Sequence, residues 1–167
     1  MFREMRRLKQ SMTEEECLSV LKNGTSGVLA VAGDDDYPYA VPLSYVYDEG
    51  KIFFHCAQTG HKLDGIARNA KVSFCVVGLD DVMPEKYTTY YRSVIVFGRA
   101  RVLDDPWEKR SALEKLAARY SPDQVEGRAR EVDRQLAQVC MVEVAIEHMT
   151  GKESMEFVRR KTGGSPQ

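Results

Sequence analysis

Three extended segments follow one another between residues 27 and 57, and only short polar turns separate them. Residues 27–32 form a continuous apolar run, residues 37–47 alternate between the two faces of a strand, and residues 51–57 return after Asp48-Glu49-Gly50. Glycine is available in that turn for the positive φ that tight hairpins use. Neighbouring strands joined by short turns favour an antiparallel sheet, and a small barrel removes the exposed edges of such a sheet.

The same patterns continue along the chain and predict a mainly β fold with about six strands. Pro42 cannot donate to a sheet ladder, so its strand needs an edge or a bulge there. Gly98 lies within a long strand and predicts a bend or bulge. Residues 79–88 are predicted to form an irregular loop. The predicted strands cover residues 27–32, 37–47, 51–57, 71–78, 89–103 and 140–148.

Three to four helices are predicted to flank this sheet. Thr13 and Glu16 form a capping-box pair ahead of the first helix. A short amphipathic helix is expected over residues 62–69. Pro106 falls in the first turn of a third helix, and the apolar spacing over residues 125–139 indicates a fourth. The sequence contains neither a Rossmann glycine pattern nor a Walker loop, so a doubly wound nucleotide fold is unsupported.

Composition is that of an ordinary globular protein. The 167 residues make one domain the default, with 43% hydrophobic and 29% charged residues and a net charge of −1. This charge gives no reason to expect nucleic acid or an anionic membrane as a partner. No apolar run approaches membrane length, and the N-terminus lacks the apolar core of a signal peptide, so we expect a cytoplasmic protein without a membrane anchor.

We expect three parts along the chain. Residues 1–10 form a basic arm, residues 11–152 form a single domain, and residues 153–167 form a C-terminal tail that is frayed from Thr162 onward. The favoured interpretation of the arm is a solvated leader. A grip on a ligand or on a second subunit is the alternative.

We predict no metal site. The cysteines at positions 17, 56, 75 and 140 contain no C-x-x-C pair, which favours reduced and mostly buried thiols over a disulfide frame or zinc ligands. Cys56 is interpreted as a buried strand thiol, with a reactive thiol as the alternative. Asp34-Asp35-Asp36 indicates a solvated hairpin tip rather than a set of ligands.

Residues 53–66 contain the residue types most suited to chemistry. They predict an aromatic strand, a polar turn and the first turns of a helix, with two of the three histidines of the chain inside. His61 and Lys62 fall where the backbone N–H groups of a helix start are unpaired, which is a ready site for an anion such as phosphate. The alternative is that both are solvated residues of a first helical turn.

Four blocks of sequence, in fixed order and spacing, resemble a known family. They begin with Pro38-Tyr39-Ala40-Val41-Pro42-Leu43-Ser44-Tyr45 and Phe54-His55-Cys56-Ala57, and they continue with Gly60-His61-Lys62 and Tyr91-Arg92-Ser93-Val94 to Gly98. Together they resemble the pyridoxamine 5′-phosphate oxidase-like superfamily, and more narrowly its branch related to the nitroimidazole-resistance (Nim) proteins. The resemblance runs from about Met5 to Lys152.

This resemblance implies an FMN-binding split β-barrel that forms a homodimer, with two FMN molecules in clefts at the subunit interface. In such proteins the strand matching residues 41–45 lies along the flavin ring and ribityl chain, and the helix start at His61 meets the phosphate. The block matching residues 91–93 borders the cleft, from the same or the other subunit. The implied cofactor-binding residues are Val41, Pro42, Leu43, Ser44, Tyr45, His55, Cys56, Ala57, His61, Lys62, Tyr91, Arg92 and Ser93.

The resemblance also suggests roles for single residues. In the Nim-like match His55 lies near the flavin and orients or protonates a substrate, whereas a histidine among aromatic residues is otherwise a packed one. Arg92 is either a surface strand charge or part of a phosphate site or interface. His148 is interpreted as structural or exposed.

The leading functional hypothesis is an FMN-dependent oxidoreductase that reduces an electron-poor small molecule, such as a nitroaromatic, with electrons from a nicotinamide nucleotide or a reductase. The alternatives are a flavin- or haem-binding protein without turnover, in which His55 is an axial haem ligand, and a reductase that uses a deazaflavin. The C-terminal Arg-x-x-Pro ending of true pyridoxamine phosphate oxidases is missing. Oxidation of that vitamer is therefore not expected.

Overall fold

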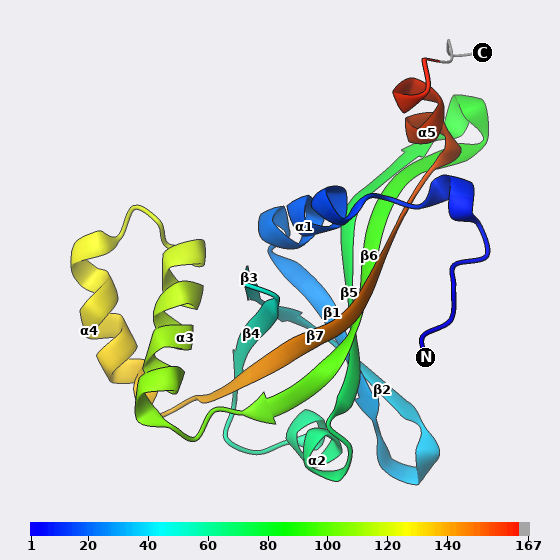
Figure 1. Ribbon diagram of the computed structural model, residues 1–167. Helices are drawn as coiled ribbons and strands as arrows, with labels where there is room; N and C mark the ends of the chain where they lie inside the picture. The colour runs from blue at the N-terminus through cyan, green and yellow to red at the C-terminus, as the bar shows by residue number, and fades with distance from the viewer. Residues whose placement is uncertain (164–167) are drawn as a thin grey trace.

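The computed structural model describes residues 1–163, so the end of the predicted tail, residues 164–167, lies outside the described part. Within residues 1–163 seven strands form one antiparallel sheet in the order β2-β1-β5-β6-β7-β4-β3 (Figure 1). The sheet curls without closing, as in a split barrel. The strands are β1 (Ser26–Ala32), β2 (Pro38–Ser44), β3 (Val46–Asp48), β4 (Lys51–Cys56), β5 (Lys71–Met83), β6 (Thr88–Val102) and β7 (Cys140–Glu153).

The mainly β, antiparallel class is confirmed, but the predicted strand count of about six is wrong. The single strand predicted over residues 37–47 is two strands that meet at Tyr45. β2 pairs with β1 at one edge of the sheet, and β3 pairs with β4 at the other edge. Because two peptide units span at most about 7 Å, one residue can join these edges only if the sheet curls until they approach each other. Tyr45 therefore fixes the position of the split.

The barrel interior is apolar and follows the alternation predicted from the sequence. Tyr39, Val41 and Leu43 of β2 face the core, and Pro42 faces outward on an edge strand, where its missing N–H costs no ladder bond. The predicted irregularity at Gly98 is confirmed as a register shift between β6 and β7. The fully buried side chains of the interior include Leu29, Ile52, Phe54, Phe74, Val76, Val94, Val96, Val142 and Val144.

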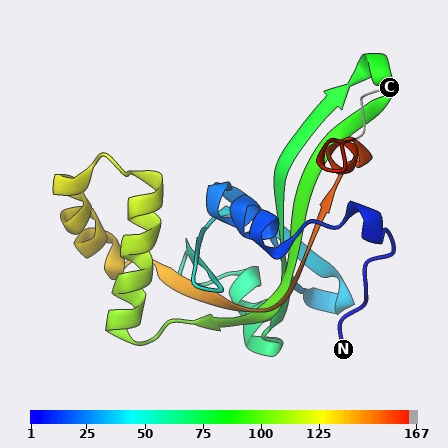
Figure 2. The same ribbon diagram turned by 45° about the horizontal axis from the view of Figure 1, so that its top comes forward.

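The irregular loop predicted over residues 79–88 is wrong. β5 and β6 continue past a bulge next to Gly78 and form a two-stranded ribbon that projects from the barrel and turns at Pro84–Lys86 (Figure 2). Residues 77–82, the β5 half of this ribbon, are exposed on both faces, whereas Tyr90 of the β6 half is buried against Phe157 of α5. Since no core selects apolar residues on one face, the polar sequence around Asp80 carried no strand signal.

Five α-helices occur within the described chain, more than the three to four predicted. The predicted capping box of α1 is present, because Thr13 and Glu16 each bind the other's backbone N–H. The fifth helix, α5, lies in the segment predicted as a C-terminal tail. The helices are α1 (Glu14–Asn23), α2 (His61–Arg68), α3 (Pro106–Tyr120), α4 (Val125–Leu136) and α5 (Met155–Lys161), with short 3-10 turns at Leu8–Gln10, Asp34–Asp36 and Pro84–Lys86.

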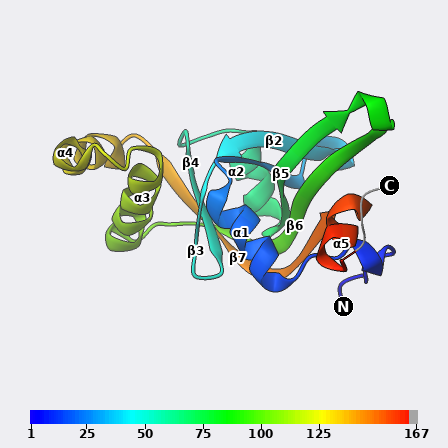
Figure 3. The same cartoon turned by 90° about the horizontal axis from the view of Figure 1, so that it is seen from above.

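Two helices form a separate layer on the outside of the barrel. α3 and α4 make a hairpin at one end of the molecule, and the β5–β6 ribbon lies at the other end (Figure 3). A second apolar cluster joins this hairpin to the outer side of β4 and β7, through Phe53 and Met141 from the sheet and Leu113 and Val132 from the helices. The insertion between β6 and β7 therefore covers the part of the sheet that carries His55.

Candidate functional site

The predicted anion site is the turn between β4 and α2. Gly60 is the N-cap of α2, with a φ of 140° that glycine adopts readily, and the place where a side chain would stand is open space. The carbonyl of Gly60 accepts bonds from the N–H groups of Leu63 and Asp64. Among the described residues, the N–H groups of His61 and Lys62 have no partner, so they are the free donors of the helix start.

His61 begins α2 and packs against the β1–β2 turn. Its ring stacks on Tyr39 with a centroid distance of 4.1 Å. Its Nε2 atom is buried without a hydrogen-bond partner, and the Asp34 carboxylate lies 3.6 Å away, too far for a hydrogen bond. Arg68 binds the same carboxylate at 2.8 Å. The first of the three aspartates is thus part of an ion pair at an exposed tip, and it competes with any anion for His61.

Lys62 is the freer cation of the pair. Within residues 1–163 its ammonium makes no hydrogen bond or ion pair, although the side chain is half-buried. Its charge also acts on Cys56 at the end of β4. Burial raises the pKa of the Cys56 thiol to about 11, with a smaller contribution from Cys140 opposite it on β7, and Lys62 opposes this shift. The thiol is therefore protonated at neutral pH, as the buried-thiol interpretation requires.

His55 lies on the outer side of β4 and borders a pocket of about 500 Å³ between the sheet and the α3–α4 hairpin. Burial lowers the pKa of the imidazole below its ordinary value of 6.5, so the ring is mostly neutral at pH 7. Ser44 of β2 borders the same pocket. The fold thus brings together Ser44 and His55, two predicted site residues from strands at different places in the sheet.

The helical wall of this pocket was not predicted to belong to the site. Leu116 and Tyr120 come from α3, and Glu131 and Gln135 come from α4. The apolar spacing of both helices predicted that they bury one face, but it does not show against which surface. The local sequence therefore gave no signal that they face His55.

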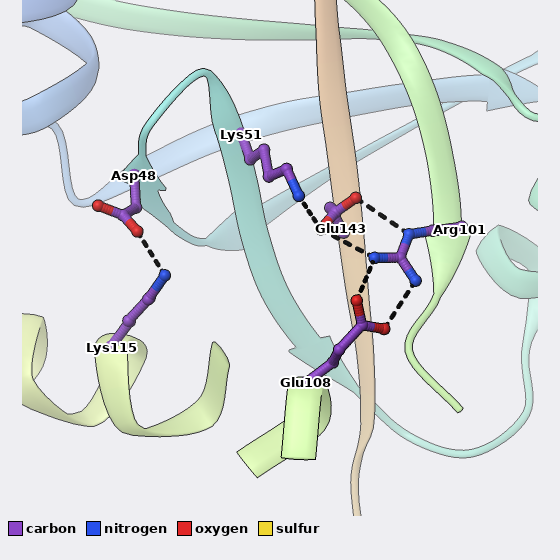
Figure 4. A network of polar contacts seen from close by, with 6 residues as sticks. All are labelled: Asp48, Lys51, Arg101, Glu108, Lys115 and Glu143. Carbon is purple, nitrogen blue, oxygen red and sulfur yellow. Dashed lines mark hydrogen bonds and ion pairs between the residues drawn. The ribbon is translucent and has the colours of Figure 1, made fainter. Parts of the chain in front are cut away.

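α3 is fixed to the barrel by two sets of ion pairs (Figure 4). Near its start, Glu108 forms a two-point pair with Arg101 of β6 at 2.9 Å. Arg101 and Lys51 both bind the buried carboxylate of Glu143 on β7, at 3.0 Å and 2.9 Å. About two turns further on, Lys115 pairs with the Asp48 carboxylate at the tip of β3. The pocket wall is therefore held at both ends of its contact with the sheet.

Tyr120, at the end of α3, fixes the split of the barrel itself. Its hydroxyl accepts a hydrogen bond from the Tyr45 backbone N–H at 2.9 Å and can donate to the carbonyl of Thr25 or of Tyr45. Tyr45 lies between two strands, so neither sheet edge pairs its backbone groups. One helix residue thus supplies partners that the sheet lacks there.

The predicted wall residues 41–45 divide between two faces. The side chains of Val41, Leu43 and Tyr45 point into the barrel core. Pro42 and Ser44 point outward, and the strand has one free edge because β2 pairs only with β1. A ligand along this strand would therefore meet the backbone and the side chains of Pro42 and Ser44.

Residues 91–93 lie elsewhere in the chain's own structure. The Tyr91 hydroxyl accepts a bond from Gln10, and Arg92 binds the buried carboxylate of Glu153 at 3.2 Å and covers the Phe157 ring of α5. α5 and α2 lie at opposite ends of the molecule (Figure 1). One chain therefore does not bring Arg92 near His61, and a shared site with residues 91–93 requires a second copy.

Comparison with known proteins identifies the family. The model of the pyridoxamine 5′-phosphate oxidase family matches residues 13–153, and the chain belongs to this family. A search of curated proteins found no significant match. Among the described residues, no helix is long and apolar enough to cross a membrane.

Several solved structures share the fold. A candidate 5-nitroimidazole antibiotic resistance protein from Bacteroides thetaiotaomicron matches with a TM-score of 0.75 at 21% identity, over 86% of each chain. A FAD-binding protein from Mesorhizobium loti matches with a TM-score of 0.64 at 25% identity, over 87% of this chain and 97% of the other. A FAD and haem binding protein from Mycobacterium smegmatis matches with a TM-score of 0.72 at 25% identity, over 87% and 73%.

Proposed function

We propose that this protein is an FMN-binding oxidoreductase that reduces electron-poor small molecules with electrons from a nicotinamide nucleotide or a reductase. The observation that carries the proposal is the start of α2, where the N–H groups of His61 and Lys62 are free, the Lys62 ammonium has no partner among the described residues, and the side-chain position at Gly60 is open space. Donors and a cation at a helix start fit a phosphate group. The flavin-binding names of two relatives support the choice of a flavin.

The residues of the chain fit the phosphate end of this cofactor. Lys62 and the helix start would hold the phosphate, and Ser44 and His55 line the pocket under the α3–α4 hairpin. Asp34 and Asp64, the latter in the first turn of α2, oppose an anion, and Arg68 pairs with Asp34. Bound FMN would supply hydride and electron transfer. The chain's own part is to hold the phosphate, exclude water with the α3–α4 hairpin and place the His55 imidazole beside the substrate.

We also propose a homodimer, built on the outer face of the sheet opposite the core. In register, uncharged side chains run across β2, β1, β5, β6 and β7, and several are large, apolar and exposed, including Val28, Val77 and Ile95. Phe2 of the N-terminal arm stacks on Phe97 and His148 at one part of this face. An exposed apolar sheet face of this kind marks an interface. The central row is Pro42, Val28, Cys75, Ile95 and Thr150.

Retention of FMN by the Lys62→Ala variant tests the cofactor assignment. Loss of the ammonium leaves the phosphate without its cation, so we expect affinity for FMN to fall by about tenfold or more. Flavin fluorescence quenching measures the dissociation constant, and Lys22→Ala, an exposed lysine of α1, is the control. Equal affinity in the Lys62 and Lys22 variants would refute the phosphate site. Reduction of the bound flavin by NADH or NADPH, followed by its visible spectrum, then tests the reaction.

Haem binding is the second candidate. One relative binds both FAD and haem, and here a neutral His55 borders an apolar pocket, as an axial ligand requires. Addition of haem would then produce a Soret band that the His55→Ala variant lacks. A protein that holds flavin and shows no such band is a flavoprotein only.

A further inference from the structure

The pocket between the sheet and the α3–α4 hairpin has an apolar wall and a polar rim. Leu113, Leu116 and Val132 form the wall and are almost completely buried. His55, Ser44 and Glu131 contribute the polar groups. Its volume of about 500 Å³ is in the range of pockets that hold small organic ligands. The apolar wall can pack against an aromatic ring.

Within residues 1–163, the pocket lining carries a negative charge and no positive one. Among the described residues that line the pocket there is no lysine or arginine, and Glu131 is the one carboxylate. Hydrogen bonds from Arg134 and Gln135 lower the pKa of Glu131, so it is ionised at neutral pH. His55 adds no compensating charge because its imidazole is mostly neutral. An anionic ligand therefore meets a carboxylate and no lining cation.

Arg134 weakens this carboxylate without removing its effect. It contacts both oxygens of Glu131 from the next turn of α4, at 3.0 Å and 2.6 Å, but it is exposed and does not line the pocket. Exposed ion pairs of this kind contribute little and exchange readily. A carboxylate accepts about four hydrogen bonds, and Glu131 accepts three from Arg134 and Gln135. One acceptor position remains for a ligand.

We propose that this pocket is the substrate site, and that Glu131 makes it select cationic or uncharged aromatic molecules with a hydrogen-bond donor over anionic ones such as phosphate esters. The assignment of the pocket to a substrate rests on the proposed flavoprotein function. The charge preference is a property of the pocket and does not depend on that function. It separates this chain from the reaction in its family's name, because pyridoxamine 5′-phosphate carries a phosphate.

Three probes with one common ring test the preference: para-nitrobenzylamine, para-nitrobenzyl alcohol and para-nitrobenzyl phosphate. Their dissociation constants are measured by calorimetry with the full chain, both flavin-loaded and flavin-free. We expect the amine to bind about two- to fivefold tighter than the alcohol, as for a half-exposed ion pair, and the phosphate ester to bind weakest. Equal affinities, or tightest binding of the ester, would overturn the proposal.

Variants on α4 assign the effect to one side chain. Glu131→Gln keeps the shape and should reduce the affinity for the amine to that for the alcohol. Arg134→Gln removes the competing cation and should tighten amine binding by about twofold or more. Glu126→Gln, an exposed carboxylate of the same helix outside the pocket, is the matched control. An equal loss of affinity for the amine in the Glu126 and Glu131 variants would show that the preference comes from the overall charge of the protein. The proposed site would then be rejected.

The two preparations separate this inference from the proposed function. If the protein binds no flavin but the flavin-free chain shows the charge order, the proposed function fails and the pocket preference stands. If probes bind only the flavin-free chain and flavin displaces them, the pocket holds the flavin ring and the substrate assignment is overturned. Binding of the probes to the loaded protein in the expected order supports both.

Discussion

Tyr120 links two parts of the structure, although it was not predicted as a site residue. Its hydroxyl pairs the backbone of Tyr45 at the split of the barrel, while its ring borders the pocket that contains His55. The same side chain therefore links the barrel seam to the proposed substrate site. A residue in this position affects stability and site geometry together.

The Tyr120→Phe variant should be less stable by about 1–2 kcal/mol, because the Tyr45 N–H is left without its partner. Urea denaturation measures the loss as a lower midpoint with an unchanged slope. Tyr37→Phe, which removes an exposed hydroxyl, is the control and should leave the midpoint unchanged. A midpoint that is the same in both variants would show that water replaces the Tyr120 hydroxyl without cost.

The pH dependence of turnover tests the role of His55. Burial lowers its pKa below 6.5, so the imidazolium that could protonate a substrate becomes populated only as the pH falls below that value. If His55 donates the proton, the rate should rise as the pH falls from 7 toward 5, and His55→Asn should remove this rise. A rise that persists in His55→Asn would assign the proton to another group.

At the scale of elements, α3 positions the pocket wall. Its start is set by Asp105, whose carboxylate accepts bonds from the N–H groups of Trp107 and Glu108 at 3.0 Å and 2.9 Å. Glu108 then joins Arg101 and Glu143, and Lys115 joins Asp48. The wall is therefore defined by a cap and by ion pairs to β6 and β3, with Glu143 of β7 joined through Arg101.

The Asp105→Ala variant should lower stability by about 1 kcal/mol, because two helix-start N–H groups lose their acceptor. Thermal and urea unfolding measure the change. Asp104→Ala alters a neighbouring exposed carboxylate that does not cap the helix, and it serves as the control. If both alanine variants lose the same stability, the effect comes from net charge and not from the cap.

At the scale of the whole molecule, the distance between α2 and residues 91–93 within one chain is the feature that calls for a second copy. Arg92 pairs with Glu153 of its own chain and covers the Phe157 ring of α5, and α5 lies at the opposite end of the molecule from α2. The uncharged outer sheet face offers the surface on which two chains could pair. Dimerisation and flavin retention should therefore depend on the same residues.

The Ile95→Lys variant tests this dependence, because it places a charge in the central row of the outer face. We expect light scattering to report a monomer and flavin retention to fall, with the fold preserved by circular dichroism. Val125→Lys changes a more exposed apolar residue of α4 outside that face and should remain dimeric. A stable monomer of the unmodified chain with bound flavin would contradict the dimer.

The sequence predicted the local features of the fold well and the pairing of distant segments poorly. The Thr13 cap, the shared face of Tyr39, Val41 and Leu43, and the irregularity at Gly98 were all predicted and are confirmed. Each depends on residues within a few positions of one another. The polar β5–β6 ribbon was missed because no core faces it.

For the candidate site, the helix start at His61 and Lys62 was visible in the sequence, since a helix N-terminus is defined by its own first turn. The alternation in the sequence also predicted which side chains of a strand share a face. Only the tertiary structure decided that the chain changes sheet edge at Tyr45, that α3 and α4 face His55, and that Asp34 approaches His61. Alternation records the face a side chain occupies, whereas strand pairing and helix docking join residues far apart in the chain.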